Sequence, residues 1–265
     1  MAVNKKTVEI GRISRSVLEI TNLHKSFDGL KAVEGFSLSL ESGKITSLIG
    51  PNGAGKTTVF NIVTGFLTPN SGTITFEQGR LTGLSPFGIA RRGMARTFQN
   101  LRLFRKMTVL DNLLLSHQNQ PGENFLNALF AYSDSSPENK RRLGKSLSLL
   151  EFVGLAEYRH ELADNLSYGQ QKLLTIACCL AMEPKLLMLD EPVSGVQPIM
   201  IEKITNILKE LVEKEKKSVF LIEHDMDFVL RISDNVVVMD DGKKITEGTP
   251  EVVKNNPEIL EAYLS

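Results

Sequence analysis

The sequence predicts an α/β fold with a mostly parallel sheet in its core, an antiparallel β portion and a helical subdomain. Three observations predict it. Short apolar segments of strand character alternate with segments of helical periodicity, the pattern of a parallel sheet covered by helices. Asp240-Asp241-Gly242 separates two strand-like segments, and this tripeptide predicts a hairpin turn. Residues 119–139 are rich in Gly, Pro, Ser and Asn and lie between two helical patterns, which indicates a helical insert.

The individual elements are expected from local patterns of apolar residues. Strands are expected over residues 17–23, 36–40, 44–49, 73–76, 186–190, 219–222, 236–239 and 243–247. Helices are expected over residues 56–65, 108–115, 141–153, 169–182 and 199–215. The charged residues 210–217 are interpreted as the solvated end of the last of these helices.

The order of these elements predicts the domain organisation. Residues 1–14 are expected to form an N-terminal extension, and residues 249–265 a C-terminal helix. Residues 15–99 and 173–248 are expected to build the α/β core, with a helical subdomain over residues 100–172. A chain of 265 residues is long enough for such a unit to bury a large core.

Composition excludes several classes of protein. The chain has 31 Lys and Arg against 31 Asp and Glu, which gives no electrostatic reason to expect a nucleic-acid partner. No apolar stretch reaches the roughly 18–20 residues that span a bilayer, and the basic N-terminal residues lack the apolar segment of a secretory signal. Cys178 and Cys179 are expected to be buried thiols, because neighbours in a helix point in different directions. A soluble, cytosolic chain is therefore expected, linked to any membrane through a partner.

Residues 50–58, with the sequence GPNGAGKTT, match the phosphate-binding P-loop pattern. Glycines let backbone amides approach phosphate oxygens, and the following helix points its positive N-terminal end at the same anion. Lys56 supplies a charge for the outer phosphates, and the Thr57 hydroxyl can ligate Mg²⁺. The alternative is a chance glycine-rich turn, but the strand before it and the helix after it are the context that the motif requires. The expected nucleotide-binding residues are Gly50, Pro51, Asn52, Gly53, Ala54, Gly55, Lys56, Thr57 and Thr58.

The apolar strand expected over residues 186–190 ends in Asp190, and Glu191 follows it directly. Two carboxylates therefore stand at the carboxyl end of this buried strand. Ligands of open α/β sheets bind at the carboxyl ends of the strands. Asp190 is expected to hold Mg²⁺ through water, and Glu191 to orient and deprotonate an attacking water as the catalytic base. The alternative is that both carboxylates only cap the next helix, and the P-loop makes the catalytic interpretation the better one.

The segment LSYGQQ, from residue 166, resembles the LSGGQ signature of the ATP-binding-cassette (ABC) ATPases. It precedes the acidic strand, as it does in that family. The resemblance extends over most of the chain, from about residue 17 to the end, and implies the P-loop ABC cassette fold. It also implies that the signature binds the ATP of a second subunit. The expected ATP-binding residues in trans are Ser167, Tyr168, Gly169 and Gln170.

Three further residues match landmarks of the family in the right order. Gln99 resembles the glutamine that ligates Mg²⁺, His224 the histidine that assists hydrolysis at the γ-phosphate, and Phe27 the aromatic that stacks on adenine. Taken singly, Phe27 could be a core residue, His224 could simply end a strand and Gln99 could lie on the surface. Three separate explanations of this kind do not account for the occurrence of all three residues in the order that the family shows.

The resemblance implies an ATPase that uses ATP and Mg²⁺ and works as a homodimer or as a heterodimer with a related ATPase subunit. Two nucleotides would be sandwiched between the two chains. One departure from the family pattern follows the acidic strand, where Gln197 stands in place of an aspartate that couples the two sites. This change bears on the coupling between sites and not on ATP binding.

Several segments resemble the LivG-type ATPase subunits of branched-chain (hydrophobic) amino-acid importers. They are GMARTFQNLRLFRKMTVLDNLL from Gly93, the signature with Tyr168, and the ending from Glu247. This resemblance implies transmembrane permease subunits as partners, a solute-binding protein as an indirect partner, and a peripheral place on the cytoplasmic side of the inner membrane. Residues 96–106 are expected to dock a permease helix, with a solvated basic loop as the alternative. An importer of urea or amides, an exporter or lipid-extraction system, a soluble ABC protein and a non-hydrolysing clamp are the other functions considered.

Overall fold

The computed structural model describes residues 16–99, 101–118 and 137–256. The predicted N-terminal extension, much of the predicted Gly/Pro/Ser/Asn-rich stretch and the last nine residues of the predicted C-terminal helix lie outside the described residues. Within the described ranges, no helix combines the length and the apolar character that crossing a membrane requires.

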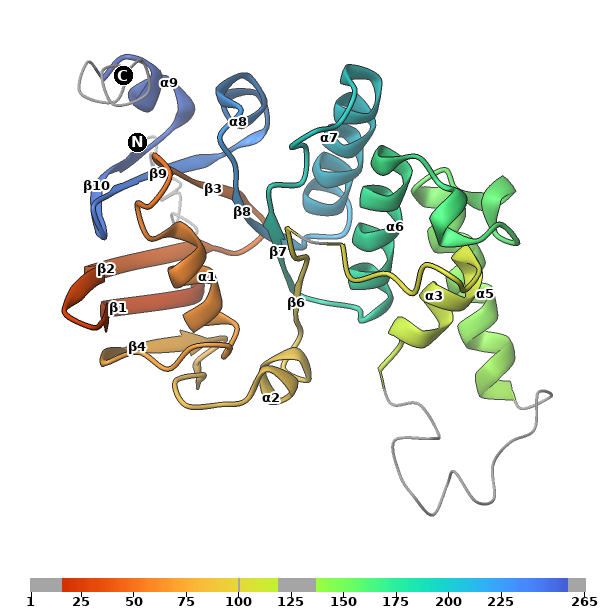
Figure 1. The fold of residues 1–265 in the computed structure, drawn as a ribbon, viewed down its shortest axis with the longest axis horizontal. Coiled ribbons are helices and arrows are strands. Elements are labelled where there is room, and N and C mark those ends of the chain that lie inside the picture. Colours follow the sequence, from red (N-terminus) through yellow and green to blue (C-terminus); the bar gives the residue numbers. More distant parts are fainter. Residues whose placement is uncertain (1–15, 100, 119–136, 257–265) are drawn as a thin grey trace, which may run out of the picture.

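The described strands form two sheets, which meet on the left of Figure 1. An antiparallel sheet has the order β2-β1-β4-β5 and comprises β1 (Ser16–Phe27), β2 (Leu30–Glu41), β4 (Ser71–Phe76) and β5 (Gly79–Arg80). A six-stranded sheet has the order β10-β9-β3-β8-β7-β6 and comprises β3 (Ile45–Ile49), β6 (Met94–Arg96), β7 (Leu186–Asp190), β8 (Ser218–Ile222), β9 (Asn235–Asp240) and β10 (Lys243–Gly248). Adjacent strands of this sheet are parallel, except for β9 and β10, which form an antiparallel hairpin. The predicted mixture of a parallel sheet and an antiparallel portion is thus confirmed.

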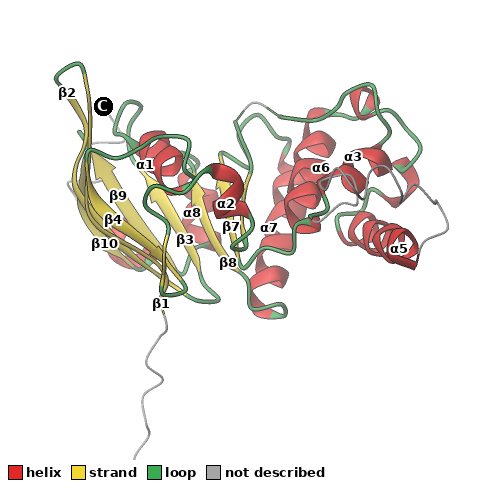
Figure 2. Ribbon diagram, turned by 90° about the horizontal axis from the view of Figure 1, so that it is seen from below, coloured by secondary structure: helices red, strands yellow, loops and turns green. Residues whose placement is uncertain are grey.

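Helices cover the six-stranded sheet and extend away from it. They are α1 (Lys56–Val63), α2 (Pro86–Ala90), α3 (Val109–Ser116), α5 (Pro137–Phe152), α6 (Tyr168–Ala181), α7 (Pro198–Glu213), α8 (Met226–Ile232) and α9 (Pro250–Lys254), with 3₁₀ turns at Ala156–Tyr158 and Ala163–Asn165. Figures 1 and 2 both place α3 and α5 at the end of the molecule far from the antiparallel sheet. Helix α6 runs across residues 172 and 173, so it belongs to both segments of the predicted division.

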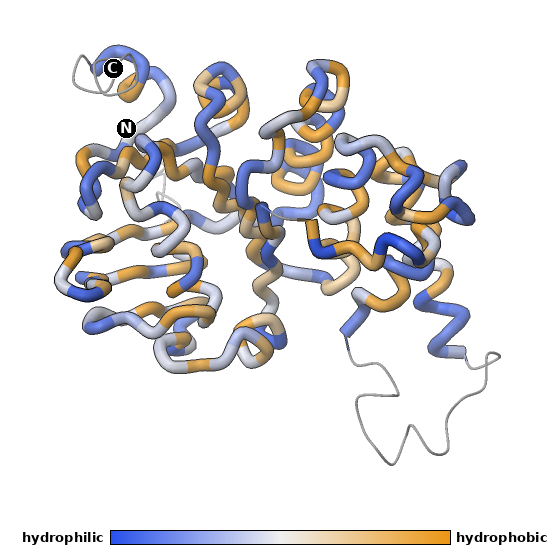
Figure 3. The backbone as a smooth tube through the Cα atoms, viewed as in Figure 1, coloured by the Kyte–Doolittle hydropathy of each residue, from blue (hydrophilic) through white to orange (hydrophobic). Residues whose placement is uncertain are grey.

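The central strands are buried on both faces, which is why they are almost continuously apolar. Alternate residues of β7 enter different cores: Leu186 and Met188 pack with α1 and the antiparallel sheet, and Leu187 and Leu189 pack with α6 and α7. Figure 3 shows the resulting concentration of apolar residues along the central strands. The sheet therefore holds α1 on one face and α6 on the other, and the phosphate loop runs from the end of β3 into α1.

Every helix and strand expected from the sequence is present, with ends shifted by a few residues. Four short elements were not expected, namely β5, α2, β6 and α8. β6 has only three residues, Met94–Arg96, which is too short for a period to be recognised. It forms because its backbone pairs with β7, from Met94 opposite Leu186 to Arg96 opposite Met188.

Candidate functional site

The phosphate loop connects β3 to α1 and depends on its glycines. Gly50 has φ +153°, and a Cβ there would lie 1.9 Å from the carbonyl oxygen of Met239. Gly55 has φ +98°, and a Cβ would lie 2.3 Å from the carbonyl oxygen of Ala32. Both contacts are impossible, so neither position can carry a side chain without moving the loop. At these two glycines the loop lies close against the backbone of β9 and β2.

Lys56 begins α1 and turns back over the loop. Its Nζ donates to the carbonyl oxygens of Gly50, at 2.6 Å, and of Pro51, at 2.7 Å. Burial lowers the pKa of Lys56, while the charges of Glu191 and Asp190 raise it. The start of α1 has no side-chain cap, so its N–H groups are available to an anion. The loop is therefore built to surround a negatively charged group.

The strand β7 ends at the second half of the site. Glu191 follows β7 directly, and its Oε2 accepts a hydrogen bond from Gln99 Nε2 at 3.1 Å. The Nδ1 atom of His224 lies 4.0 Å from Glu191 Oε1. The side chain of His224 is 59% exposed, whereas that of Glu191 is 22% exposed. Gln99 and His224, expected from the family resemblance, thus meet at the carboxylate of Glu191, which was expected from the acidic strand.

Asp190 is paired with a residue that the sequence interpretation placed elsewhere. Arg96 Nη2 donates to Asp190 Oδ2 at 2.9 Å, and each side chain is only 6% exposed. Arg96 Nη1 also donates to Asn61 Oδ1, at 2.7 Å, and to Thr64 Oγ1, at 3.0 Å. The expectation that residues 96–106 form an exposed surface is therefore wrong at Arg96, because this arginine ties β6 to β7 and α1.

The signature residues lie at the start of α6. Ser167 caps the helix by accepting from the Gln170 N–H, and the Gln170 side chain accepts from the Ser167 N–H. A Cβ on Gly169 would lie 3.0 Å from Met200 Cγ in α7, so this position needs a small residue. Tyr168 is 46% exposed. In the described part of the chain, no hydrogen bond or ion pair joins these residues to the phosphate loop.

Phe27 lies at the end of β1, where the chain turns into β2. Its ring is 42% exposed, and Lys25 Nζ lies 5.0 Å from the ring centroid. The alternative that Phe27 is a core residue is therefore wrong. Gln197, the departure from the family pattern, is the N-cap position of α7 and makes no side-chain capping bond.

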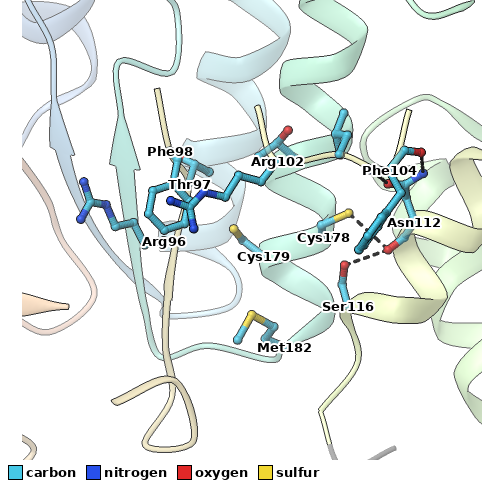
Figure 4. A pocket seen from close by; sticks show the side chains of 12 residues that line it. Arg96, Thr97, Phe98, Arg102, Phe104, Asn112, Ser116, Cys178, Cys179 and Met182 are labelled. Carbon is cyan, nitrogen blue, oxygen red and sulfur yellow. Dashed lines mark hydrogen bonds between the residues drawn. The ribbon is translucent and has the colours of Figure 1, made fainter. Parts of the chain in front are cut away.

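A pocket of about 180 Å³ opens between the segment after β6 and helices α3 and α6 (Figure 4). Asn112 of α3 holds the backbone of Phe104 at its rim, accepting from its N–H at 2.8 Å and donating to its carbonyl oxygen at 3.1 Å. The ring of Phe104 is 59% exposed. Cys178 lies in the wall, and burial raises the pKa of its thiol to about 11. Both cysteines are free thiols, as expected.

Three charged residues of the site were not expected to take part in it: Arg96, Lys172 and Glu223. Each borders an apolar run, since Arg96 follows buried Met94 and Ala95, Lys172 precedes the apolar residues of α6, and Glu223 follows β8. A charge in an apolar context requires a partner, and this was the available signal. Their partners lie far away in the sequence. The pattern of charged residues next to apolar ones could therefore identify these three residues, but it could not identify their partners.

The comparison with protein families finds a match to the ABC transporter family over residues 33–194. The chain is 42% identical to the high-affinity branched-chain amino acid transport ATP-binding proteins BraF of Pseudomonas aeruginosa and LivG of Escherichia coli. Each alignment covers 95% of this chain and 99% of the relative. It is 39% identical to a probable LivG of Methanocaldococcus jannaschii over 96% of this chain and 99% of that protein.

Solved structures agree with this assignment. The ADP conformation of an ATP-binding cassette of an ABC transporter superposes with a TM-score of 0.83 at 36% identity, covering 95% of this chain and 99% of that chain. A nucleotide-free cassette superposes with a TM-score of 0.82, also at 36% identity, over 95% of this chain and all of that chain. The fold, the site and these relatives show that the chain belongs to the ABC transporter family, as one of its ATP-binding-cassette ATPases.

Proposed function

We propose that this chain is the ATP-hydrolysing subunit of an importer of branched-chain amino acids. The meeting of Gln99, Glu191 and His224 beside the phosphate loop is the observation that supports hydrolysis. The named activity of relatives that align over 99% of their own length supports the solute class. In this proposal the chain is peripheral on the cytoplasmic side of the inner membrane, works with separate permease subunits, and receives solute indirectly from a solute-binding protein.

The phosphate loop and Phe27 would bind ATP. Backbone N–H groups of residues 50–58 would surround the phosphates, and the exposed Phe27 ring would stack on adenine. Lys56 now donates to two carbonyl oxygens of its own loop, at 2.6 and 2.7 Å. Phosphate oxygens are stronger acceptors than these carbonyls, so ATP would replace them as partners of the ammonium group.

Glu191 would act as the general base towards water, and His224 would donate a hydrogen bond to the γ-phosphate as negative charge develops. The hydrogen bond from Gln99 fixes the Glu191 carboxylate and leaves its second oxygen, Oε1, on the side of His224. Because His224 is largely exposed, its ring can move towards a nucleotide without leaving a buried cavity.

The donor set fits Mg²⁺. The described residues hold no cluster of three or more His, Cys, Asp or Glu, so a cation here would depend on hydroxyl, amide and phosphate oxygens. The Thr57 hydroxyl and the Gln99 amide oxygen are hard donors of this kind. Asp190 would reach the ion through water, because its Oδ2 is already bound by Arg96. When bound, Mg²⁺ would neutralise phosphate charge.

Two chains would bind two ATP molecules between them, as a homodimer or with a related ATPase subunit. Each chain would present Ser167, Tyr168, Gly169 and Gln170 to the nucleotide of its partner. The place of these residues at the start of α6 supports this role, since a helix N-terminus attracts phosphate. The separation of the signature from the phosphate loop of the same chain agrees with binding in trans.

The pocket beneath Phe104 would receive a helix of the permease. Its lining is mostly apolar, with Arg102 at its edge, and an accessible apolar rim of this type is typical of a partner site. The chain that forms its wall leads directly back to Gln99. A movement of Gln99 on nucleotide binding would thus be transmitted through this segment to the docked helix.

Hydrolysis and dimerisation are tested together. Glu191→Gln should keep ATP binding and slow turnover by about 10²–10⁴-fold, since it removes the base. The same variant with ATP should be a dimer in light scattering, because the nucleotide is not consumed. Ser167→Arg in that background should be monomeric, because its bulk occupies the phosphate position. Normal turnover of Glu191→Gln, or a stable dimer of the double variant, would contradict the proposal.

A further inference from the structure

Two buried charged side chains hold the turn that follows β7. The first is Lys172 of α6, which is 5% exposed and donates from Nζ to the carbonyl oxygen of Glu191 at 2.5 Å. The second is Glu223 at the end of β8, which is 0% exposed and accepts at Oε1 from the Val193 N–H at 2.8 Å. The turn of residues 191–193 is therefore held at its first carbonyl by a cation and at its last amide by an anion.

Burial of these two groups is unfavourable by itself. Burial lowers the pKa of Lys172, while the charges of Glu223, Glu191 and Asp190 raise it. Burial also raises the pKa of Glu223, while hydrogen bonds from the backbone of Val193 and His224 lower it. Apolar side chains of similar size would fill the same space at lower cost. The contacts that distinguish Lys172 and Glu223 from such residues are those to the backbone of the turn.

That backbone needs support. Glu191 has φ +49°, a left-handed conformation that residues other than glycine adopt only when their surroundings impose it. Its N–H donates to the carbonyl oxygen of Ile222 at 3.0 Å, and its carbonyl oxygen accepts from Lys172. Both sides of the unusual conformation are therefore fixed, one by β8 and the other by α6.

We propose that Lys172 and Glu223 are positioning residues that hold residues 191–193 in the conformation that aims the Glu191 carboxylate. The proposal deepens the function given above and rests on it, because it takes Glu191 as the general base. Lys172 lies on the helix that begins with Ser167, and Glu223 precedes His224 and also accepts from its N–H at 3.1 Å. The buried side chains of Lys172 and Glu223 thus connect α6 and the segment after β8, which contains His224, to the turn that carries the Glu191 carboxylate.

The test is ATP turnover by the full chain at high protein concentration, where dimers form. Lys172→Met keeps the apolar stem and removes the ammonium group. We expect kcat to fall about 10- to 100-fold, while the KM for ATP stays within about twofold, because only the aim of the base changes. Lys217→Met is the matched control, since Lys217 also donates to a backbone carbonyl, that of Pro184, at the opposite end of β7. This control should keep its kcat.

The double variant Lys172→Met/Glu191→Gln separates positioning from a general structural role. If Lys172 acts through Glu191, the double variant should hydrolyse ATP no more slowly than Glu191→Gln alone. A further loss of tenfold or more would overturn the proposal. If Glu191→Gln itself turns over normally, the proposed function is wrong. If it is inactive while Lys172→Met matches the wild type, only the positioning role is wrong.

Glu223→Gln tests the other end of the turn and does not depend on the folding of the lysine variant. One carboxylate oxygen becomes an NH₂ group, so only one of the N–H groups of Val193 and His224 keeps its acceptor. We expect kcat to fall about tenfold, with ATP binding close to that of the wild type and a melting temperature lower by only about 5 °C, because one buried N–H group loses its acceptor. An unchanged kcat, or a loss of kcat that only follows a loss of ATP binding, would overturn the proposal.

Discussion

Replacement of Arg96 by Met should destabilise the folded chain strongly. The guanidinium group joins three elements, because it binds Asp190 at 2.9 Å, Asn61 at 2.7 Å and Thr64 at 3.0 Å. Met fills much of the same volume and provides none of these hydrogen bonds. The carboxylate of Asp190, with its side chain 6% exposed, would remain buried without its cation.

The magnitude follows from three contributions. Removal of one partner from a buried ion pair costs about 3–5 kcal/mol. Two further acceptors lose their donor, at about 1 kcal/mol each. The Arg96 Nε atom is buried without a partner, so its removal returns about 1–3 kcal/mol. The net loss is about 4 kcal/mol in the free energy of unfolding, which corresponds to a decrease of about 10 °C in melting temperature.

The assay is thermal and urea unfolding of the full chain. Arg102→Met is the matched control, because Arg102 is exposed and its guanidinium carbon lies 3.6 Å from the Phe98 ring centroid. An exposed cation–π contact contributes about 0.5–1 kcal/mol, so the control should melt within about 3 °C of the wild type. Asp190→Asn added to Arg96→Met should recover part of the loss, because it removes the unpaired charge.

A stability of Arg96→Met equal to that of Arg102→Met would contradict this prediction. The ion pair would then add nothing to the folded state beyond what an exposed arginine adds. A double variant less stable than Arg96→Met alone would show that the unpaired Asp190 carboxylate is not the source of the loss.

Three other substitutions test separate parts of the site. Phe27→Ala should weaken ATP affinity by about 1–3 kcal/mol in calorimetry, and unchanged affinity would mean that another residue holds adenine. Lys56→Ala should abolish tight ATP binding, because it removes the fixed positive charge of the phosphate loop. Phe104→Asp should keep the wild-type melting temperature, since the ring is 59% exposed, and should lose assembly with the permease. Phe87→Asp, at a ring that is 61% exposed in α2, should keep that assembly, and equal assembly of both variants would contradict the proposed dock.

The parts of this protein that could be predicted from its sequence are those whose information lies in neighbouring residues. The phosphate loop needs a strand, closely spaced glycines and a helix, and all of them are contiguous within residues 45–63. The buried strand β7 and the two carboxylates after it are equally local. The order of such motifs identified the family. The helices and strands with clear apolar periods could be predicted for the same reason, because their faces repeat over two or more turns or pleats.

Which charged side chains meet depends on the packing of distant elements. β6 is too short to have a pattern of its own and exists through its pairing with β7. That pairing brings Arg96 to Asp190, so a residue expected on the surface became the buried partner of the acidic strand. Lys172 and Glu223 were visible only as charges in apolar surroundings, since their contacts depend on the order of β7 and β8 and on how α6 packs on the sheet. A contact between two distant residues leaves no repeating pattern in the sequence, because it depends on the path of the whole chain.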